Sequence, residues 1–291
     1  MTDVACVLDI RALLGECPIW CAEEQRLYWA DLDGRTINRF NPETGGNEVW
    51  SLPAQVGSFA LREGGGMLVA LRSGLHTGRF GEPDLKPVAH PEAHLPLNRY
   101  NDGRTDPAGR FWVGSMRDPQ DHDQRTGSLY RLGTDGAMTR MVEGIGTSNG
   151  LAFSPDGRTM YFADSTPQVQ TIWAFDYDAE TGTPSNRRVF ATTDGLPGRP
   201  DGACVDEEGC YWSANVYGWQ VVRYAPDGQV VRTIPVPVEK PSMVCFGGPK
   251  LDVLYITSIR VPPIKPGQDR AGSLFACEPG VRGIPEPRYR G

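Results

Sequence analysis

The sequence lacks the features that identify several common classes of protein. None of its seven cysteines forms a Cys-x-x-Cys pair, and Cys17 and Cys21, four residues apart, have no second pair or nearby histidine to complete a zinc site. Basic residues number 29 against 36 acidic ones, so the net charge of −7 leaves no basic excess for nucleic acid. We therefore expect free thiols rather than a zinc site, and no nucleic-acid partner.

Long apolar runs are also missing. The first residues, MTDVACVLDI, contain neither the basic start nor the apolar run of a signal peptide, and no later run approaches the roughly 20 residues of a membrane-spanning helix. A catalytic triad of serine, histidine and aspartate drawn from distant parts of the chain stays open. The expectation is a cytoplasmic protein without a membrane partner.

Turn-forming residues, in contrast, are abundant, with 35 glycines and 25 prolines spread along the chain. In residues 148–165, the apolar run Leu-Ala-Phe is followed by the sequence Ser-Pro-Asp-Gly at 154–157 and then by a second apolar run, Met-Tyr-Phe-Ala. Proline presets φ at the first corner of a turn, aspartate can bond its own backbone, and glycine supplies a positive φ. The stretch is therefore predicted to be a β-hairpin.

The same unit occurs six times. The copies open on a polar residue and are spaced 42, 43, 48, 52 and 41 residues apart. Their opening residues are Glu16, Ser58, Asn101, Asn149, Asp201 and Ser242. Each hairpin is followed by room for two further strands, which is typical of a propeller blade. We predict an all-β, six-bladed β-propeller with four-stranded blades that forms one domain over residues 1–291, its ring closed by a strand within residues 4–10.

The register of the repeats predicts a site. The innermost strands of a propeller line its central channel, so the six opening residues should form a polar ring at one mouth. This ring contains two carboxylates and two amides but no lysine or arginine, which favours a bound cation, and oxygen ligands suit a hard divalent ion. The alternative is that these side chains only bond backbone and water. Three inserted stretches, residues 81–98, 117–126 and 261–271, are candidate lids.

Four motifs resemble the SMP-30/gluconolactonase family, which includes the regucalcin-like sugar lactonases. They are LGECPIW at 14–20, NRYNDG at 98–103, SNGL at 148–151 and RPDG at 199–202. The resemblance covers nearly the whole chain. It implies a six-bladed propeller with one divalent metal, either Ca²⁺, Mn²⁺, Mg²⁺, Zn²⁺ or Fe²⁺, in the channel.

The resemblance also implies roles for individual residues. The family's metal ligands fall on Glu16, Asn149 and Asp201, and its substrate-binding arginine and asparagine fall on Arg99 and Asn101. Two further positions match the family's pattern less directly. These are Asp118, where some relatives contribute an acidic residue to sugar hydroxyls, and Cys17, where relatives usually carry glycine, so that a thiol follows Glu16.

The resulting hypothesis is metal-dependent hydrolysis of a sugar lactone to the aldonic acid. The metal would act as a Lewis acid and Asp201 as the general base for the attacking water. Two alternatives stay open: a metal-dependent esterase or phosphotriesterase on the same fold, which should have a more apolar channel, and a non-catalytic metal-binding propeller. A monomer is expected for a closed ring.

Overall fold

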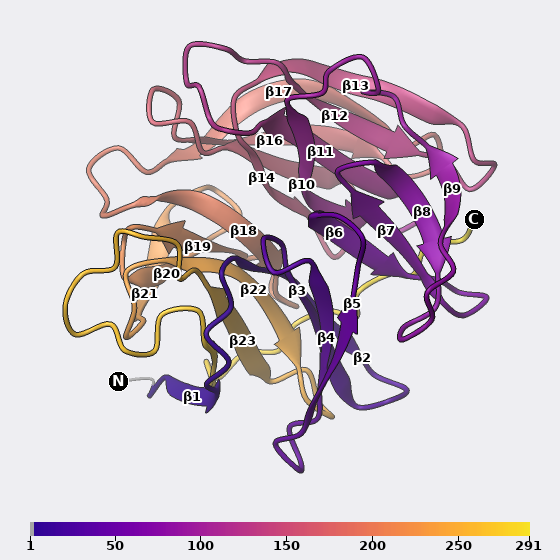
Figure 1. Ribbon diagram of the computed structural model, residues 1–291. Coiled ribbons are helices and arrows are strands. Elements are labelled where there is room, and N and C mark those ends of the chain that lie inside the picture. The colour runs from indigo at the N-terminus through magenta and orange to yellow at the C-terminus, as the bar shows by residue number, and fades with distance from the viewer. Residues whose placement is uncertain (1–2) are drawn as a thin grey trace.

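The computed structural model describes residues 3–291, so that residues 1 and 2 of the predicted domain lie outside the described residues. The described chain forms six four-stranded antiparallel sheets and contains no helix, and hence none that could cross a membrane. Figure 1 shows the sheets arranged round a common centre, toward which the first strand of each repeat lies. The predicted six-bladed β-propeller is confirmed.

The six blades follow the order of the sequence. Blade 1 holds β2 (Gly15–Cys21), β3 (Arg26–Asp31), β4 (Thr36–Phe40) and β5 (Asn47–Ser51). Blade 2 holds β6 (Val56–Leu61), β7 (Met67–Leu71), β8 (Gly74–Gly78) and β9 (Lys86–Ala89). Blade 3 holds β10 (Asn98–Thr105), β11 (Phe111–Arg117), β12 (Gly127–Leu132) and β13 (Met138–Ile145).

The second half of the ring repeats this arrangement. Blade 4 holds β14 (Ser148–Phe153), β15 (Thr159–Asp164), β16 (Thr171–Asp178) and β17 (Thr183–Thr192). Blade 5 holds β18 (Arg199–Val205), β19 (Tyr211–Val216), β20 (Gln220–Tyr224) and β21 (Val230–Pro235). Blade 6 holds β22 (Pro241–Gly247), β23 (Val253–Ser258), β24 (Leu274–Cys277) and, from the other end of the chain, β1 (Ala5–Leu8).

Strand β1 closes the ring as predicted. It pairs antiparallel with β24, with Ala5 opposite Ala276 and Leu8 opposite Leu274. It lies outermost in blade 6, beside strands from the end of the chain (Figure 1). The two ends of the chain are therefore joined by a shared sheet.

The hairpin of residues 148–165 forms as its sequence predicts. Gly157 adopts a φ of 67°, and its N–H donates to the carbonyl of Ser154 at 2.9 Å. Leu151, Phe153 and Met160 are buried in one cluster with residues of blade 3. Positive φ values recur at the turn glycines Gly66, Gly109 and Gly209.

Every inner strand contains a break in pairing next to the opening residue of its repeat. The register shifts lie between Glu16 and Ile19, Val56 and Ser58, Tyr100 and Gly103, Asn149 and Ala152, Pro200 and Ala203, and Pro241 and Val244. A β-bulge inserts an extra residue and turns the strand locally, which re-aims a side chain. Each repeat thus presents its opening region at the same end of the channel with the same local distortion.

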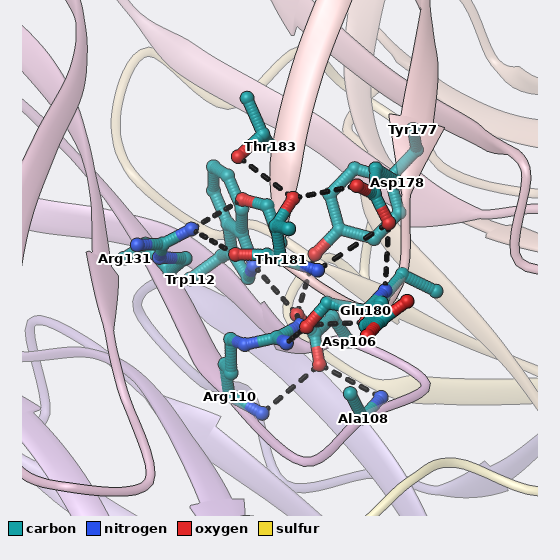
Figure 2. Close-up of polar contacts among 12 residues, drawn as sticks. Asp106, Ala108, Arg110, Trp112, Arg131, Tyr177, Asp178, Glu180, Thr181 and Thr183 are labelled. Carbon is teal, nitrogen blue, oxygen red and sulfur yellow. Dashed lines mark hydrogen bonds and ion pairs between the residues drawn. The ribbon is translucent and has the colours of Figure 1, made fainter.

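Neighbouring blades are also joined by polar contacts at the opposite end of the strands, as Figure 2 shows for blades 3 and 4. The fully buried carboxylate of Asp106 accepts hydrogen bonds from the backbone N–H groups of Ala108 and Arg110, from Trp112 Nε1 and from Tyr177 Oη. The Arg110 guanidinium bonds this carboxylate at 3.0 Å and the Ala179 carbonyl at 3.0 Å. One carboxylate therefore organises a turn of blade 3 and holds it against blade 4.

The C-terminal segment, residues 279–291, crosses this second face of the ring (Figure 1). Gly283 N–H bonds the Leu251 carbonyl of blade 6 at 2.8 Å, and Tyr289 N–H bonds the Leu61 carbonyl of blade 2 at 2.9 Å. Between them, half-buried Glu286 forms an ion pair with the buried Arg104 of β10 at 2.5 Å. A cavity of about 470 Å³ at this end is lined largely by apolar side chains and by this segment.

Candidate functional site

The predicted polar ring lies in a cavity of about 280 Å³ at the other end of the channel. Four of the six opening residues line it, and polar and charged side chains together outnumber apolar ones there. Its acidic and amide side chains include Glu16, Asp33, Asn101, Asp118, Asn149 and Asp201, and its basic ones are Arg99, Arg199 and Lys240. The sequence-predicted metal and substrate residues are therefore brought together in one place.

The two serines of the predicted ring do not line this cavity. Ser242 Oγ instead donates to the Gly15 carbonyl and lies 2.9 Å from Thr257 Oγ1, and Ser58 is fully buried. A serine side chain is too short to extend past the neighbouring strand, so it serves the packing between blades. The polar ring thus has four members in the cavity rather than six.

Glu16 and Asp201 are both buried in the cavity wall. Burial, followed by the charges of Asp201 and Asp102, raises the pKa of Glu16 well above its usual value. Burial and then the charge of Asp102 raise the pKa of Asp201 to about 8. Within residues 3–291 neither carboxylate forms an ion pair with a basic side chain, so both ionised forms would be stabilised by a cation.

Asp102 is a third buried carboxylate, which the sequence prediction did not single out. Its Oδ2 accepts the N–H of Leu151 at 2.9 Å, while the buried Oδ1 has no hydrogen-bond partner among the described residues. Burial raises its pKa. It follows a ring residue directly in the sequence, and its negative charge acts on both Glu16 and Asp201.

A chain of hydrogen bonds connects the amides of the ring to Arg99. Arg99 Nη1 donates to Asn101 Oδ1 at 2.6 Å, and Asn101 Nδ2 donates to Asn149 Oδ1 at 2.9 Å and to the Ser148 carbonyl at 2.8 Å. Asn149 Nδ2 in turn donates to Ser165 Oγ at 2.7 Å. The side-chain oxygen of Asn149 keeps one lone pair for a further ligand, as does that of Asn101.

Asp118 lies beside Arg99 on the same blade and pairs with two arginines. Its Oδ2 is 2.8 Å from Arg72 Nη1 and 3.8 Å from Arg99 Nε. Because Arg99 is held by Asp118 on one side and Asn101 on the other, its guanidinium is fixed at the cavity wall. Asp118 thus orients Arg99 and itself lines the cavity.

The opposite side of the mouth contains a second basic group, which sequence reasoning missed. The Arg199 guanidinium carbon lies 5.0 Å and Lys240 Nζ lies 5.2 Å from the centre of the Tyr217 ring. A signal for it exists in the sequence: Arg199 and Lys240 each precede a ring residue by two positions, as Arg99 does. Only a comparison of all six repeats at that offset reveals it.

Two of the three candidate lids contribute to the cavity. Asp118 and Gln120 come from the stretch 117–126, and Val261 and Pro262 come from 261–271. The stretch 81–98 provides none of the lining residues, because buried Glu92 ties it to the side of blade 3 through Ser115 and Tyr130.

Cys17 does not face the site either. It adopts a φ of 49°, where glycine is favoured, and its Sγ lies 3.5 Å from the Phe59 carbonyl and 3.4 Å from the Phe59 N–H of the next blade. The thiol fills space between blades 1 and 2. It supplies no ligand to the cavity.

The donor set fits a hard divalent cation. No group of three histidine, cysteine or acidic side chains that could hold a metal by itself occurs in residues 3–291, so an amide oxygen must complete any set. Glu16 and Asp201 are buried carboxylates without an ion pair among the described residues, and Asn149 has a free lone pair in the same cavity. Carboxylate and amide oxygens are the ligands that such ions prefer.

Comparisons with known proteins cover the whole propeller. A family model described as the SMP-30/Gluconolactonase/LRE-like region matches residues 14–260. The chain is 41% identical to a 6-deoxy-6-sulfogluconolactonase of Pseudomonas putida over 98% of both proteins. It is 35% identical to the pentonolactonase XacC of Haloferax volcanii over 97% of this chain and 96% of that protein.

A solved structure agrees with these similarities. The calcium-binding protein regucalcin from Agrobacterium tumefaciens str. C58 superposes with a TM-score of 0.94 at 30% identity, covering 100% of this chain and 98% of that one. The similarity therefore includes the closing strand and the loops at the cavity as well as the blades.

Proposed function

The chain belongs to the SMP-30/gluconolactonase/LRE-like family, and from this premise we propose that it is a lactonase that hydrolyses a sugar lactone to the aldonic acid with one divalent metal ion. The observation that carries the proposal is the meeting of Glu16, Asn149 and Asp201 with Arg99 and Asn101 in one polar cavity. The names of the two curated relatives, a sulfogluconolactonase and a pentonolactonase, support the class of substrate.

Glu16, Asn149 and Asp201 would hold the metal, for which Ca²⁺, Mn²⁺, Mg²⁺, Zn²⁺ and Fe²⁺ are the candidates. When bound, a divalent ion supplies a Lewis acid that polarises the lactone carbonyl and offsets the negative charge that develops on its oxygen. The calcium-binding name of the regucalcin structure supports a metal at this site.

Asp201 acts as the general base. Water adds to the carbonyl carbon as Asp201 takes its proton, the ring C–O bond breaks, and the proton passes to the departing ring oxygen, which becomes a hydroxyl group of the open-chain acid. A general base must hold its proton-accepting oxygen within hydrogen-bond reach of the attacking water, and the position of Asp201 in the cavity lining allows this.

Arg99, Asn101 and Asp118 position the substrate. Their mutual contacts restrict the Arg99 guanidinium to one orientation, so its remaining donors can bind ring oxygens and hydroxyl groups without a further loss of side-chain entropy. Both N–H groups of Asn101 are used within the protein, and its Oδ1, which already accepts a bond from Arg99, has one lone pair left to accept a hydroxyl proton.

The cavity distinguishes this function from the alternatives. An esterase or phosphotriesterase acting on apolar substrates would need an apolar wall, whereas this wall is mainly polar and charged. A metal-binding propeller without catalysis would retain the metal and a ligand but would release no acid. We also propose that the enzyme is a cytoplasmic monomer; its seven free cysteines suit a reducing compartment.

The first experiment measures acid release from a panel of pentono- and hexonolactones. The protein is stripped with a chelator and then supplied with one divalent metal at a time. Acidification that requires a metal supports the proposal. Stoichiometric metal binding without acceleration of any sugar lactone would overturn it in favour of a binding propeller or a different esterase.

A second experiment separates the two roles of Asp201. We expect Asp201→Asn to lower kcat by at least about a hundredfold, because a lost general base typically costs this much, while metal affinity falls much less. Asp84→Asn, at an exposed position outside the cavity, is the matched control and should keep full activity. Equal losses of turnover and metal binding would contradict a separate base role.

A further inference from the structure

We propose that the preferred lactone carries an anionic group, a sulfonate, phosphate or carboxylate, that binds Arg199 and Lys240. This inference rests on the proposed lactonase function and adds the charge of the substrate to it. It is carried by the basic group of Arg199, Tyr217 and Lys240 at the cavity mouth.

This basic group lies across the channel from the sugar-binding residues. Arg199 opens β18 of blade 5, and Lys240 directly precedes β22 of blade 6. Arg99 and Asp118 belong to blade 3, and the Arg72 that pairs with Asp118 belongs to blade 2. In a ring of six, blade 2 faces blade 5 and blade 3 faces blade 6. A substrate held at Arg99 would therefore extend its far end toward Arg199 and Lys240.

No carboxylate of the described chain lies within ion-pairing distance of this group, and the charges of Asp201 and Glu239 act on Arg199 and Lys240 only from farther away. Within residues 3–291, Arg199 and Lys240 form no ion pair, and Lys240 Nζ donates only to the carbonyls of Val261, at 2.9 Å, and Pro263, at 3.3 Å. The adjacent Glu239 is already bound to Lys265. In contrast, Arg99 and Arg72 on the other side share the carboxylate of Asp118.

Two unpaired cations beside one tyrosine ring form a site for an anion. Tyr217 provides only a weak cation–π attraction to each, and the two cations repel one another when nothing negative lies between them. The Asp201 carboxylate acts on Arg199 from beyond ion-pairing distance, and a metal held by Glu16 and Asp201 would offset the negative charge of both. An oxyanion with several oxygens can accept a bidentate pair of bonds from arginine and a further bond from lysine.

The test compares kcat/KM for charged and neutral aldonolactones. The neutral probe is glucono-δ-lactone, and the charged probes carry a sulfonate, a phosphate or a carboxylate at C6. We expect at least one charged lactone to be preferred by about tenfold or more, since a single charge-assisted hydrogen bond typically changes affinity by at least about this factor. The three charged probes identify which anion the site selects. The preference should shrink at high ionic strength.

Two variants assign the preference to these residues. Arg199→Gln and Lys240→Gln should each lower the ratio of charged to neutral kcat/KM about tenfold, whereas Lys240→Arg, which keeps the charge, should retain most of it. Arg187→Gln is the matched control, because Arg187 lies over the Trp173 ring at 5.5 Å but outside the cavity, and its ratio should equal that of the wild type.

The outcomes separate the two proposals. Efficient hydrolysis of neutral lactones with no preference for a charged one, or a ratio unchanged in Arg199→Gln and Lys240→Gln, overturns the anionic substrate and leaves the lactonase intact. Hydrolysis of no lactone, charged or neutral, with any metal overturns the lactonase itself.

Discussion

At the scale of single residues, Cys17 follows a predicted metal ligand but faces away from it, into the contact between blades 1 and 2. Burial raises the pKa of this thiol, as it does for Cys204 and Cys245 in the inner strands. A buried thiol that stays protonated reacts slowly, because the thiolate is the nucleophile. Of the seven cysteines, only Cys6 is partly exposed.

We therefore predict that a thiol reagent modifies one cysteine, Cys6, in the native protein and all seven after denaturation. Ellman's reagent gives the number, and peptide mass spectrometry after alkylation gives the position. Cys6→Ser should abolish the native-state reaction. Fast modification of Cys17 in the folded protein would contradict its placement between the blades.

Glu16 and Asp201 make the stabilisation by metal depend on pH. The pKa of Asp201 rises from its ordinary 3.8 to about 8 on folding, and that of Glu16 rises too. At pH values between 3.8 and about 8, the carboxyl of Asp201 keeps its proton in the folded metal-free protein but has lost it in the unfolded chain. The contribution of these groups to stability therefore falls as pH rises. A bound metal removes this penalty because it binds the ionised carboxylates.

The increase in Tm on adding a saturating divalent metal should thus be larger at pH 8 than at pH 5. Scanning calorimetry of chelator-treated and metal-loaded protein at both values measures it. In the double variant Glu16→Gln, Asp201→Asn the difference between the two pH values should vanish. An equal increase in Tm at pH 5 and pH 8 in the wild type would show that metal binding is not coupled to the loss of protons from these carboxyls.

At the scale of strands and turns, the Asp106 cluster of Figure 2 predicts a large effect from one side chain. Asp106→Ala would leave the partly buried Arg110 guanidinium, Trp112 Nε1 and Tyr177 Oη without their common acceptor. Removing one partner of a buried charge pair typically costs about 3–5 kcal/mol of the free energy of unfolding. Urea denaturation measures this loss.

A suitable control is Asp178→Ala in the same cluster. Its exposed carboxylate bonds the backbone of Glu180 and the hydroxyl of Thr181, groups that water can satisfy. The loss of stability should be clearly smaller than for Asp106→Ala. Similar losses from the two variants would mean that burial of Asp106 is not the cause.

The strands and turns could largely be predicted from the sequence, because hairpins are local. Gly157 and the apolar runs on either side of it form their hairpin from residues that are close together in the sequence. The path of residues 279–291 across the ring could not be predicted. Its backbone hydrogen bonds, from Gly283 and Tyr289, go to carbonyls of distant blades and leave no periodic pattern in the sequence. The serines at 58 and 242 had the right register but side chains too short to reach the cavity.

At the scale of the whole molecule, the site could be predicted as far as repeat symmetry extends. Symmetry places Glu16, Asn149 and Asp201 around one cavity. The ion pairs of Asp118, and the lack of an ion pair at Arg199 and Lys240 in the described chain, depend instead on loops that differ between blades. Only in the closed ring is it decided on which side of the cavity mouth the basic side chains form ion pairs with a carboxylate. It follows from no single repeat.

Closure of the ring predicts the effect of shortening the chain. Deletion of residues 1–9 removes β1 and exposes the edge of β24 and the apolar cluster that Val7 and Leu8 cover. We expect the free energy of unfolding to fall by about 3–5 kcal/mol, by area burial, and the open edge to promote association. Chemical denaturation and light scattering measure both effects.

A synthetic peptide of residues 3–10 provides the control for this deletion. If the loss comes from the missing strand, the peptide should raise the Tm of the shortened protein in proportion to the logarithm of its concentration once it is in excess. A shortened protein as stable as the full chain would contradict the closing role of β1.

The pairing of β1 with β24 also fixes an order of events on the ribosome. The strand Ala5–Leu8 emerges before all the other strands of the ring, and its partner Leu274–Cys277 emerges after them. At roughly 5–20 residues per second, the first strand waits on the order of tens of seconds while blades 1 to 5 can assemble in turn. A ribosome that stalls before residue 277 therefore leaves an open ring with two unpaired edges, a species that quality control can recognise.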